Sequence, residues 1–456
     1  MILPAFVGTA TMRLPLSAYL FIICSIIVAL VIAVYRLFIH PLRKIPGPWY
    51  YAISSWQLYY NDLIGDTSRN IHKLHASYGS VIRIGPDHVI FNSLTALKTI
   101  YGVGSRSNRT AFYKIFEPYG RPTMFTMSGS EDHAERKKCL VRAYAKTGIV
   151  RGAVAETIES KVEQLLQLFR SNIDGSEICS QLYYYTLDVG TAFIFTPQLG
   201  TEALQGNGSH RALLYDLGIS KRGHRSSVPG ILCTRLLQYL NIEQAISFKH
   251  VRVWALGAFD RYREMRQQKK TSPDVVALVT ELWNQREKRE DSTLRDIDLA
   301  SECADHLAAA IETTRNTMVF LIWAMSLREN AHLQSKVRDE VQELQSSDFN
   351  EHGYPTVEAA GKLVYVNAVI KESLRLYAPL PQLQPRCFDW DMVIDGHFIP
   401  ARTTVSMAPF TQHRHEEIFT QPYKFDPERW LSENSTEMQR WWWPFSTGGR
   451  ACTGIQ

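Results

Sequence analysis

The sequence predicts a mainly α-helical protein with small β-sheets, preceded by one N-terminal transmembrane helix. Residues 150–290 have a mostly helical pattern, and the stretch from Asp296 to Leu327 contains neither Pro nor Gly. The β-like runs are short, and an uncharged apolar segment lies near the N-terminus. With 456 residues, 45% of them hydrophobic, the chain can bury a large core.

Composition narrows the class of protein. The net charge of +5 is mildly basic and well short of that of a nucleic-acid-binding protein. The seven cysteines are scattered, odd in number and form no Cys-x-x-Cys pair. This pattern argues against a disulfide framework or a zinc site and indicates a reducing compartment, with one cysteine free for special chemistry.

The segment from Leu16 to Tyr35 is predicted to cross a membrane. Its twenty residues carry no charge, which is the length that a bilayer core of about 30 Å requires. Arg13 precedes it, whereas Arg36, Arg43 and Lys44 follow, so the body should face the cytosol. The alternative is a buried core helix.

Domain boundaries follow from this anchor and from the Pro-Gly-Pro sequence that ends at Pro48. We expect a short lumenal N-terminus over 1–15, a transmembrane helix over 16–35 and a basic hinge over 36–48. One large domain, over 49–456, should follow.

Two β-hairpins are predicted. Val81–Ile84 and His88–Phe91 flank a Gly-Pro-Asp turn, and residues 393–399 contain an Asp-Gly turn. Aromatic residues gather over 112–125, a pattern that is typical of core packing.

The C-terminal sequence Phe-x-x-Gly-x-Arg-x-Cys-x-Gly carries the clearest chemistry. The Cys452 thiolate is a soft ligand of a kind that can hold haem iron axially. Glycines such as Gly454 allow backbone N–H groups to turn toward a thiolate. The planar fork of Arg450 suits a carboxylate. The alternative is a buried small cysteine.

Two further motifs lie on predicted helices. In the long apolar helix, Glu312 and Thr313 are costly to bury without partners, although Thr313 could instead bond to its own backbone and locally open the helix. Glu372 and Arg375 share one face of a helix over 362–377, as an ordinary surface ion pair would. Arg429 follows in a Pro-Glu-Arg-Trp sequence.

In combination, these motifs resemble those of the cytochrome P450 family. The cysteine loop resembles its haem-binding loop, and Ala-Ala-Ile-Glu-Thr-Thr resembles its oxygen-binding helix, with Ala310 where Gly is usual. The Glu-x-x-Arg pair also resembles that of the family. The order of the motifs and the Pro-Glu-Arg-Trp variant resemble those of its fungal membrane-anchored group. This resemblance covers essentially the whole chain and implies the mainly α fold of a single haem domain on a transmembrane helix.

The resemblance also implies roles for individual residues. Cys452 would be the axial ligand of the iron of haem (iron protoporphyrin). Thr313 would steady dioxygen, and Glu312 would help to deliver protons. The other cofactor contacts would come from His133, Lys137, Arg386, Phe445, Arg450 and Gly454, and a buried structural triad from Glu372, Arg375 and Arg429.

The implied activity is that of a monooxygenase that inserts one oxygen atom from O2 into an apolar small molecule, such as a terpenoid, polyketide or alkaloid. Electrons would come from NADPH through a flavoprotein cytochrome reductase, and the basic face near Lys138 could dock this donor. The aromatic stretch over 112–125 would cover the substrate. The location implied is the endoplasmic reticulum membrane.

Two alternatives remain open. A haem-thiolate isomerase or dehydratase would keep Cys452 but could dispense with Glu312 and Thr313. The family also continues past the cysteine loop into a helix beneath the haem and a β-hairpin, whereas this chain ends at Gln456. The second alternative is therefore a truncated, inactive relative that no longer retains haem.

Overall fold

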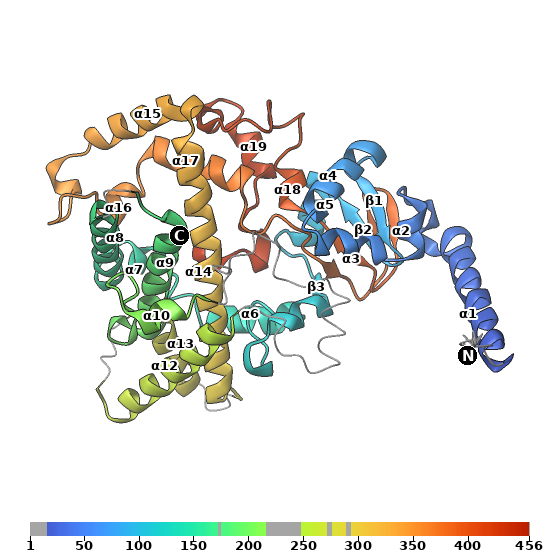
Figure 1. The fold of residues 1–456 in the computed structure, drawn as a ribbon, viewed down its shortest axis with the longest axis horizontal. Coiled ribbons are helices and arrows are strands. Elements are labelled where there is room, and N and C mark those ends of the chain that lie inside the picture. The colour runs from blue at the N-terminus through green and yellow to red at the C-terminus, as the bar shows by residue number, and fades with distance from the viewer. Residues whose placement is uncertain (1–15, 172–174, 216–247, 271–275, 289–292, 456) are drawn as a thin grey trace, which may run out of the picture.

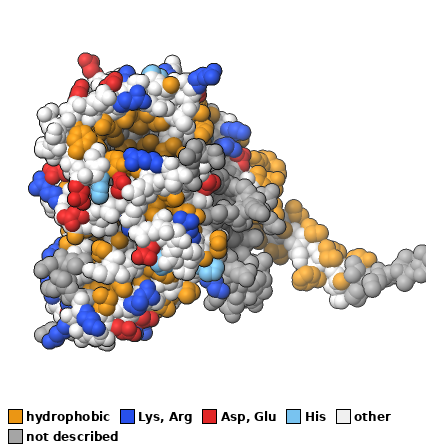
Figure 2. Space-filling view, turned by 60° about the vertical axis from the view of Figure 1, so that its left-hand side comes forward, with side chains coloured by type: hydrophobic (Ala, Val, Ile, Leu, Met, Phe, Trp, Pro, Cys, Tyr) orange, Lys and Arg blue, Asp and Glu red, His pale blue; other side chains and the backbone are white. Residues whose placement is uncertain are grey.

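The N-terminal apolar helix projects away from the rest of the molecule (Figure 1). The computed structural model describes residues 16–171, 175–215, 248–270, 276–288 and 293–455, so the predicted lumenal segment and Gln456 lie outside the described residues. Helix α1 (Leu16–Val34) continues into a π-helical turn η1 (Tyr35–Ile39). Together they form a 24-residue helix that is long and apolar enough to cross a membrane. Its apolar side chains are exposed along its length (Figure 2).

Helices make up most of the body, as the sequence predicted. They are α2 (Trp49–Ile53), α3 (Trp56–Leu63), α4 (Thr67–Tyr78), α5 (Leu94–Tyr101), α6 (Ser130–Lys138), α7 (Lys146–Ile149), α8 (Ala153–Ser171), α9 (Ile178–Phe195), α10 (Gly208–Ala212), α12 (Lys249–Gln267), α13 (Leu278–Glu287), α14 (Asp296–Ser326), α15 (Ala331–Gln342), α16 (Val357–Ala360), α17 (Val364–Leu376), α18 (Pro409–Gln412) and α19 (Ser435–Trp441).

Two small sheets accompany the helices. The larger has the strand order β1-β2-β7-β4-β3, and β5 pairs with β6 in the smaller one. The strands are β1 (Val81–Gly85), β2 (His88–Phe91), β3 (Asn108–Arg109), β4 (Arg386–Cys387), β5 (Met392–Ile394), β6 (His397–Ile399) and β7 (Thr404–Ser406). Both predicted hairpins are therefore present, as β1–β2 and β5–β6.

Helix α14 runs through the middle of the helical part of the body (Figure 1). Its buried apolar residues recur four apart at Leu299, Cys303, Leu307 and Ile311, which places them on one face of the helix. This face joins the largest hydrophobic cluster, to which α9, α12 and α13 also contribute. The predicted helix over 296–327 is thus confirmed, ending at Ser326.

Helix α6 is shorter than the sequence suggested. The sequence from His133 to Tyr144 contains neither Pro nor Gly and is compatible with a longer helix, but α6 ends at Lys138. The next residues turn, because Leu140 and Ala143 are fully buried and the Tyr144 hydroxyl bonds to His306 Nδ1 of α14 at 2.6 Å. Tertiary packing therefore overrides helical continuation here.

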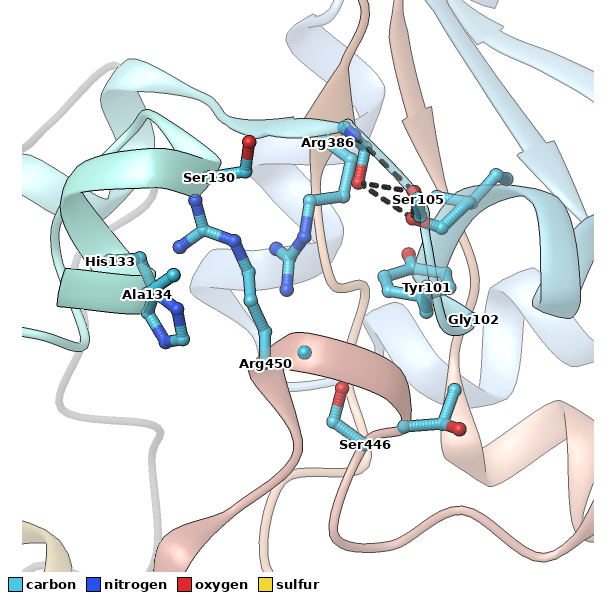
Figure 3. A pocket seen from close by; sticks show the side chains of 13 residues that line it. Tyr101, Gly102, Ser105, Ser130, His133, Ala134, Arg386, Ser446 and Arg450 are labelled. Atoms are coloured by element: carbon cyan, nitrogen blue, oxygen red, sulfur yellow. Dashed lines mark hydrogen bonds between the residues drawn. The ribbon is translucent and has the colours of Figure 1, made fainter. Parts of the chain in front are cut away.

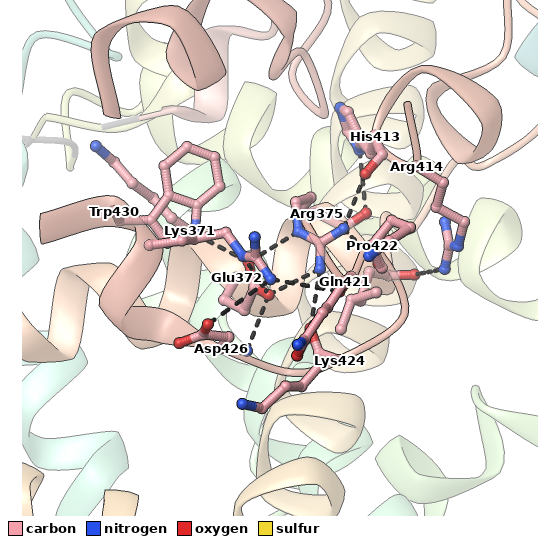
Figure 4. A network of polar contacts seen from close by, with 12 residues as sticks. Lys371, Glu372, Arg375, His413, Arg414, Gln421, Pro422, Lys424, Asp426 and Trp430 are labelled. Carbon is pink, nitrogen blue, oxygen red and sulfur yellow. Dashed lines mark hydrogen bonds and ion pairs between the residues drawn. The ribbon is translucent and has the colours of Figure 1, made fainter. Parts of the chain in front are cut away.

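The carboxylate of Glu372, on α17, is the centre of a buried polar network (Figure 4). Arg375 donates two parallel hydrogen bonds to it, both of 2.8 Å, and Arg429 donates one of 3.1 Å. The backbone N–H of Asp426 and the indole N–H of Trp430 donate to the same carboxylate at 3.0 Å.

Arg375 extends this network into the chain that leads to the cysteine loop. Its Nη1 donates to the carbonyls of His413 (2.8 Å) and Pro422 (2.7 Å). The imidazole Nε2 of His413 in turn accepts from the backbone N–H of Trp443 at 3.0 Å, two residues before Phe445. The network thus ties α17 to the segment that precedes the loop.

Glu372→Ala should lower the free energy of unfolding by about 3–5 kcal/mol, because it removes the carboxylate that pairs with the buried guanidinium of Arg375 and the nearer of the two carboxylates that pair with Arg429. Chemical denaturation followed by circular dichroism would measure this change. Glu358→Ala is the matched control, since its pair with Arg151 is exposed, and it should change stability much less. Equal effects of the two substitutions would contradict a central role for the network.

Candidate functional site

The cysteine loop is held in shape by its backbone. The amide of Cys452 donates to the Phe445 carbonyl at 2.8 Å. Gly448 has φ +67°, and a Cβ there would lie 2.4 Å from the Tyr101 carbonyl oxygen and 2.5 Å from that of Gly102. Only glycine fits this close approach to the end of α5.

Lys137 of α6 reaches this loop. Its Nζ donates to the carbonyls of Gly449 (3.0 Å) and Ala451 (3.3 Å). Cys452 is exposed as a residue, but desolvation raises the pKa of its thiol. The Gly454 amide and the charge of Lys137 oppose this shift. The thiol therefore keeps its proton at neutral pH unless a metal ion takes its place. The predicted contact of Lys137 with a haem propionate remains a prediction, since here it contacts the loop.

Two buried arginines lie opposite each other in the larger sheet. Arg109 of β3 pairs in register with Arg386 of β4, and the side chains are 7% and 2% exposed. Like charges in this arrangement repel each other. The Nε of Arg109 is buried and has no hydrogen-bond partner among the residues that the structure describes. Burial, and then the charge of Arg386, lowers the pKa of Arg109 to about 9.

Arg450 completes the positive cluster, and His133 lies beside it. Figure 3 shows the guanidinium groups of Arg386 and Arg450 directed toward the same pocket, beside the imidazole of His133. Arg450 donates to the carbonyls of Met127, Ser128 and Gly129 at 2.9, 2.6 and 2.8 Å. Burial, and then the charges of Arg450, Arg109 and Lys137, lowers the pKa of His133 to about 3. The imidazole is therefore neutral at pH 7.

The cluster of Arg109, Arg386 and Arg450 has a large excess of positive charge. Among the described residues, no carboxylate oxygen of Asp or Glu lies within 4.0 Å of a guanidinium nitrogen of Arg109, Arg386 or Arg450. Buried charges in proteins normally have a partner, so an unpaired group of this kind is suited to an anionic ligand. The guanidinium forks match carboxylates in particular.

The aromatic stretch over 112–125 packs around Arg109. The guanidinium carbon lies 4.7 Å from the ring centre of Tyr113 and 4.6 Å from that of Phe125. Phe116 contacts Phe125 edge to face. The Tyr113 hydroxyl also accepts from Arg386 at 2.6 Å. These rings therefore hold the two arginines, and a role in covering substrate remains a prediction.

Glu312 and Thr313 of α14 make hydrogen bonds to other groups than those of the arginine cluster. Thr313 Oγ1 donates to the Ala309 carbonyl at 2.7 Å, and α14 remains continuous, so the back-bonded threonine is present without the local opening that was considered. Glu312 accepts from the hydroxyl of Tyr183, on α9. Neither bond reaches the loop of Cys452.

Comparison with known proteins identifies the family. The model of the family Cytochrome P450 matches residues 45–456, which is most of the chain. The chain belongs to the cytochrome P450 family. It is 30% identical to the cytochrome P450 monooxygenase hkm5 of Aspergillus hancockii, over 92% of this chain and 82% of that protein.

Two other relatives are also named as cytochrome P450 monooxygenases. Cytochrome P450 monooxygenase stcB of Emericella nidulans is 27% identical, over 91% of this chain and 78% of its own length. Cytochrome P450 monooxygenase aflV of Aspergillus parasiticus is 28% identical, over 91% of this chain and 81% of its own length. The protein is thus a cytochrome P450 monooxygenase with fungal relatives.

The family implies a haem-thiolate cofactor, and the residues fit one. A haem group carries two carboxylates, which would match the guanidinium groups, and Cys452, two residues after Arg450, would supply a soft ligand. Sequence reasoning anticipated His133, Arg386 and Arg450 but missed Arg109. In the sequence, Arg109 is marked only by its position just before the aromatic stretch. It becomes a candidate for the site because its strand pairs with that of Arg386.

Arg109→Met should have opposite effects on the two forms of the protein. It should raise the free energy of unfolding of the haem-free chain by about 1–3 kcal/mol, because it removes a buried charge without a counter-ion. It should also weaken haem binding. Thermal unfolding and haem titration would measure the two effects. Arg170→Met, which alters an exposed arginine over the ring of Tyr354, should change neither; a destabilised haem-free Arg109→Met chain would contradict this prediction.

Proposed function

We propose that this cytochrome P450 binds haem through Cys452 and inserts one oxygen atom from O2 into an apolar small molecule. The observation that carries this proposal is the cluster of buried cations without carboxylate partners beside the cysteine loop. When bound, a haem group with a cysteine thiolate ligand supplies O2 activation and favours cleavage of the O–O bond.

The chain's own residues would bind and orient this cofactor. Arg109, Arg386 and Arg450 would donate hydrogen bonds to the propionate carboxylates. The neutral His133 would then lie near a negative charge, which favours the protonated form of its imidazole. Lys137 would fix the loop through its two carbonyl contacts, so that Cys452 is presented in one position. Phe445 and Gly454 would form the apolar and close-packed parts of the same loop.

On α14, Thr313 would steady dioxygen with its hydroxyl after releasing the carbonyl of Ala309. Glu312 would act as the acid that delivers protons. An isomerase or dehydratase would need neither group, and the relatives reported above are named as monooxygenases.

The proposal extends to the electron donor and to the location. We assign electron supply to NADPH through a flavoprotein reductase, docked on the exposed cations Lys138, Arg142 and Lys146. The helix over 16–39 would anchor the protein in the endoplasmic reticulum membrane, with the catalytic body over 49–456 in the cytosol. The substrate class would be that of fungal secondary metabolites, such as terpenoids, polyketides or alkaloids.

The absorption spectrum of the purified full chain, reduced and treated with carbon monoxide, tests this proposal. A Soret band of the thiolate-ligated type should appear, and Cys452→Ser should abolish it, because an alcohol does not replace the soft thiolate. Cys387→Ser is the control, since that half-buried cysteine lies on β4, outside the loop, and the band should persist. Absence of haem from the purified chain would instead identify an inactive relative.

A further inference from the structure

The carboxylate of Glu312 is held by a tyrosine of the neighbouring helix. The hydroxyl of Tyr183, on α9, lies 3.0 Å from Oε1 and 3.1 Å from Oε2 of Glu312. A phenol has one proton to donate, so it is shared between the two oxygens. The tyrosine side chain is 3% exposed, and water therefore has little access to the contact from that side.

The approach of α9 to α14 keeps this contact in place. A Cβ at Gly190 would lie 3.3 Å from the Leu307 side chain and 3.7 Å from that of Ala310, so the two helices are close together there. Buried residues line α9 on the side of Tyr183, including Leu187 and Ile194, which join the same hydrophobic cluster as α14. Neither helix can move away without opening the main core.

The ring of Tyr183 is fixed as well as its hydroxyl. The guanidinium carbon of Arg315, one turn along α14 from Glu312, lies 4.4 Å from the ring centre. Arg315 also donates to Asn316 Oδ1 at 2.7 Å, and the Asn316 amide donates to Glu312 Oε2 at 3.4 Å. Arg315 and Cys179 of α9 also lie close enough to Tyr183 to affect its pKa.

The protonation states follow from these surroundings. Burial, and then the negative charge of Glu312, raises the pKa of Tyr183 above its ordinary value, which outweighs the opposite effect of Arg315. The phenol therefore keeps its proton at neutral pH and donates to the carboxylate. A hydrogen bond to the charged form of an acid stabilises that form and makes the acid a readier proton donor.

We propose that Tyr183 is a positioning residue that holds the carboxylate of Glu312 against α9 and so tunes its ability to deliver protons. This inference rests on the proposed role of Glu312 and deepens it. Tyr183 acts through Glu312 and has no assigned contact with substrate or cofactor. The ring contact with Arg315 explains why an aromatic donor, rather than a serine or threonine, suits the position.

The test is a pH titration of Glu312 by infrared spectroscopy on the full chain, with the carboxyl band assigned by its loss in Glu312→Gln. Tyr183→Phe removes the hydroxyl and keeps the ring. The Glu312 pKa should rise by roughly one to two pH units in this variant, because a hydrogen bond to a charged group is lost. Tyr184→Phe is the matched control, since its ring contacts Arg211 instead, and it should leave the band unchanged.

The functional readout is the pH dependence of NADPH consumption by the haem-loaded chain with its reductase. The midpoint of the profile should move to higher pH in Tyr183→Phe, in step with the infrared titration, and Tyr183→Phe should add nothing in the Glu312→Gln background. An unchanged Glu312 titration would overturn the inference. Because this titration needs no haem, its failure is distinguishable from a failure of the proposed function, which the carbon monoxide spectrum reports.

Discussion

Unpaired positive charge in the protein interior is the constraint on which the site depends. Arg109 and Arg386 face each other across two paired strands, and Arg450 of the cysteine loop lines one pocket together with Arg386. Burying cations together is costly unless an anion joins them. The neutral state of His133, whose pKa falls to about 3, shows how strongly the pocket disfavours a further positive charge. A dicarboxylate ligand would relieve this cost.

The remaining architecture keeps these cations from separating. The β3–β4 pairing fixes two of them, and the rings of Tyr113 and Phe125 pack against Arg109 from the same segment. Gly448 lets the loop approach α5, and Lys137 joins the loop to α6. The network around Glu372 anchors the segment that leads into the loop. Stabilising contacts therefore surround a cluster of like charges that repel each other.

Much of this was predictable from local sequence. The hairpins, the apolar N-terminal helix and α14 follow from turn chemistry and from runs without Pro or Gly, and Cys452 follows from its glycine-rich motif. The family resemblance implied the contact of Arg429 with Glu372, but two other contacts between distant segments were not predicted. Arg109 matters because β3 pairs with β4, and Tyr183 because α9 packs on α14. Likewise, α6 ends early because Tyr144 bonds to His306. None of these three contacts between distant segments leaves a periodic pattern in the sequence.

Haem binding with and without free propionates tests the central claim most directly. The full chain, freed of haem, is titrated with haem and with haem dimethyl ester, in which both carboxylates are blocked, and binding is followed by absorption. If the cation cluster holds the propionates, the ester should bind at least about tenfold more weakly, since even one charge-assisted hydrogen bond contributes that much. Equal affinities would contradict the account.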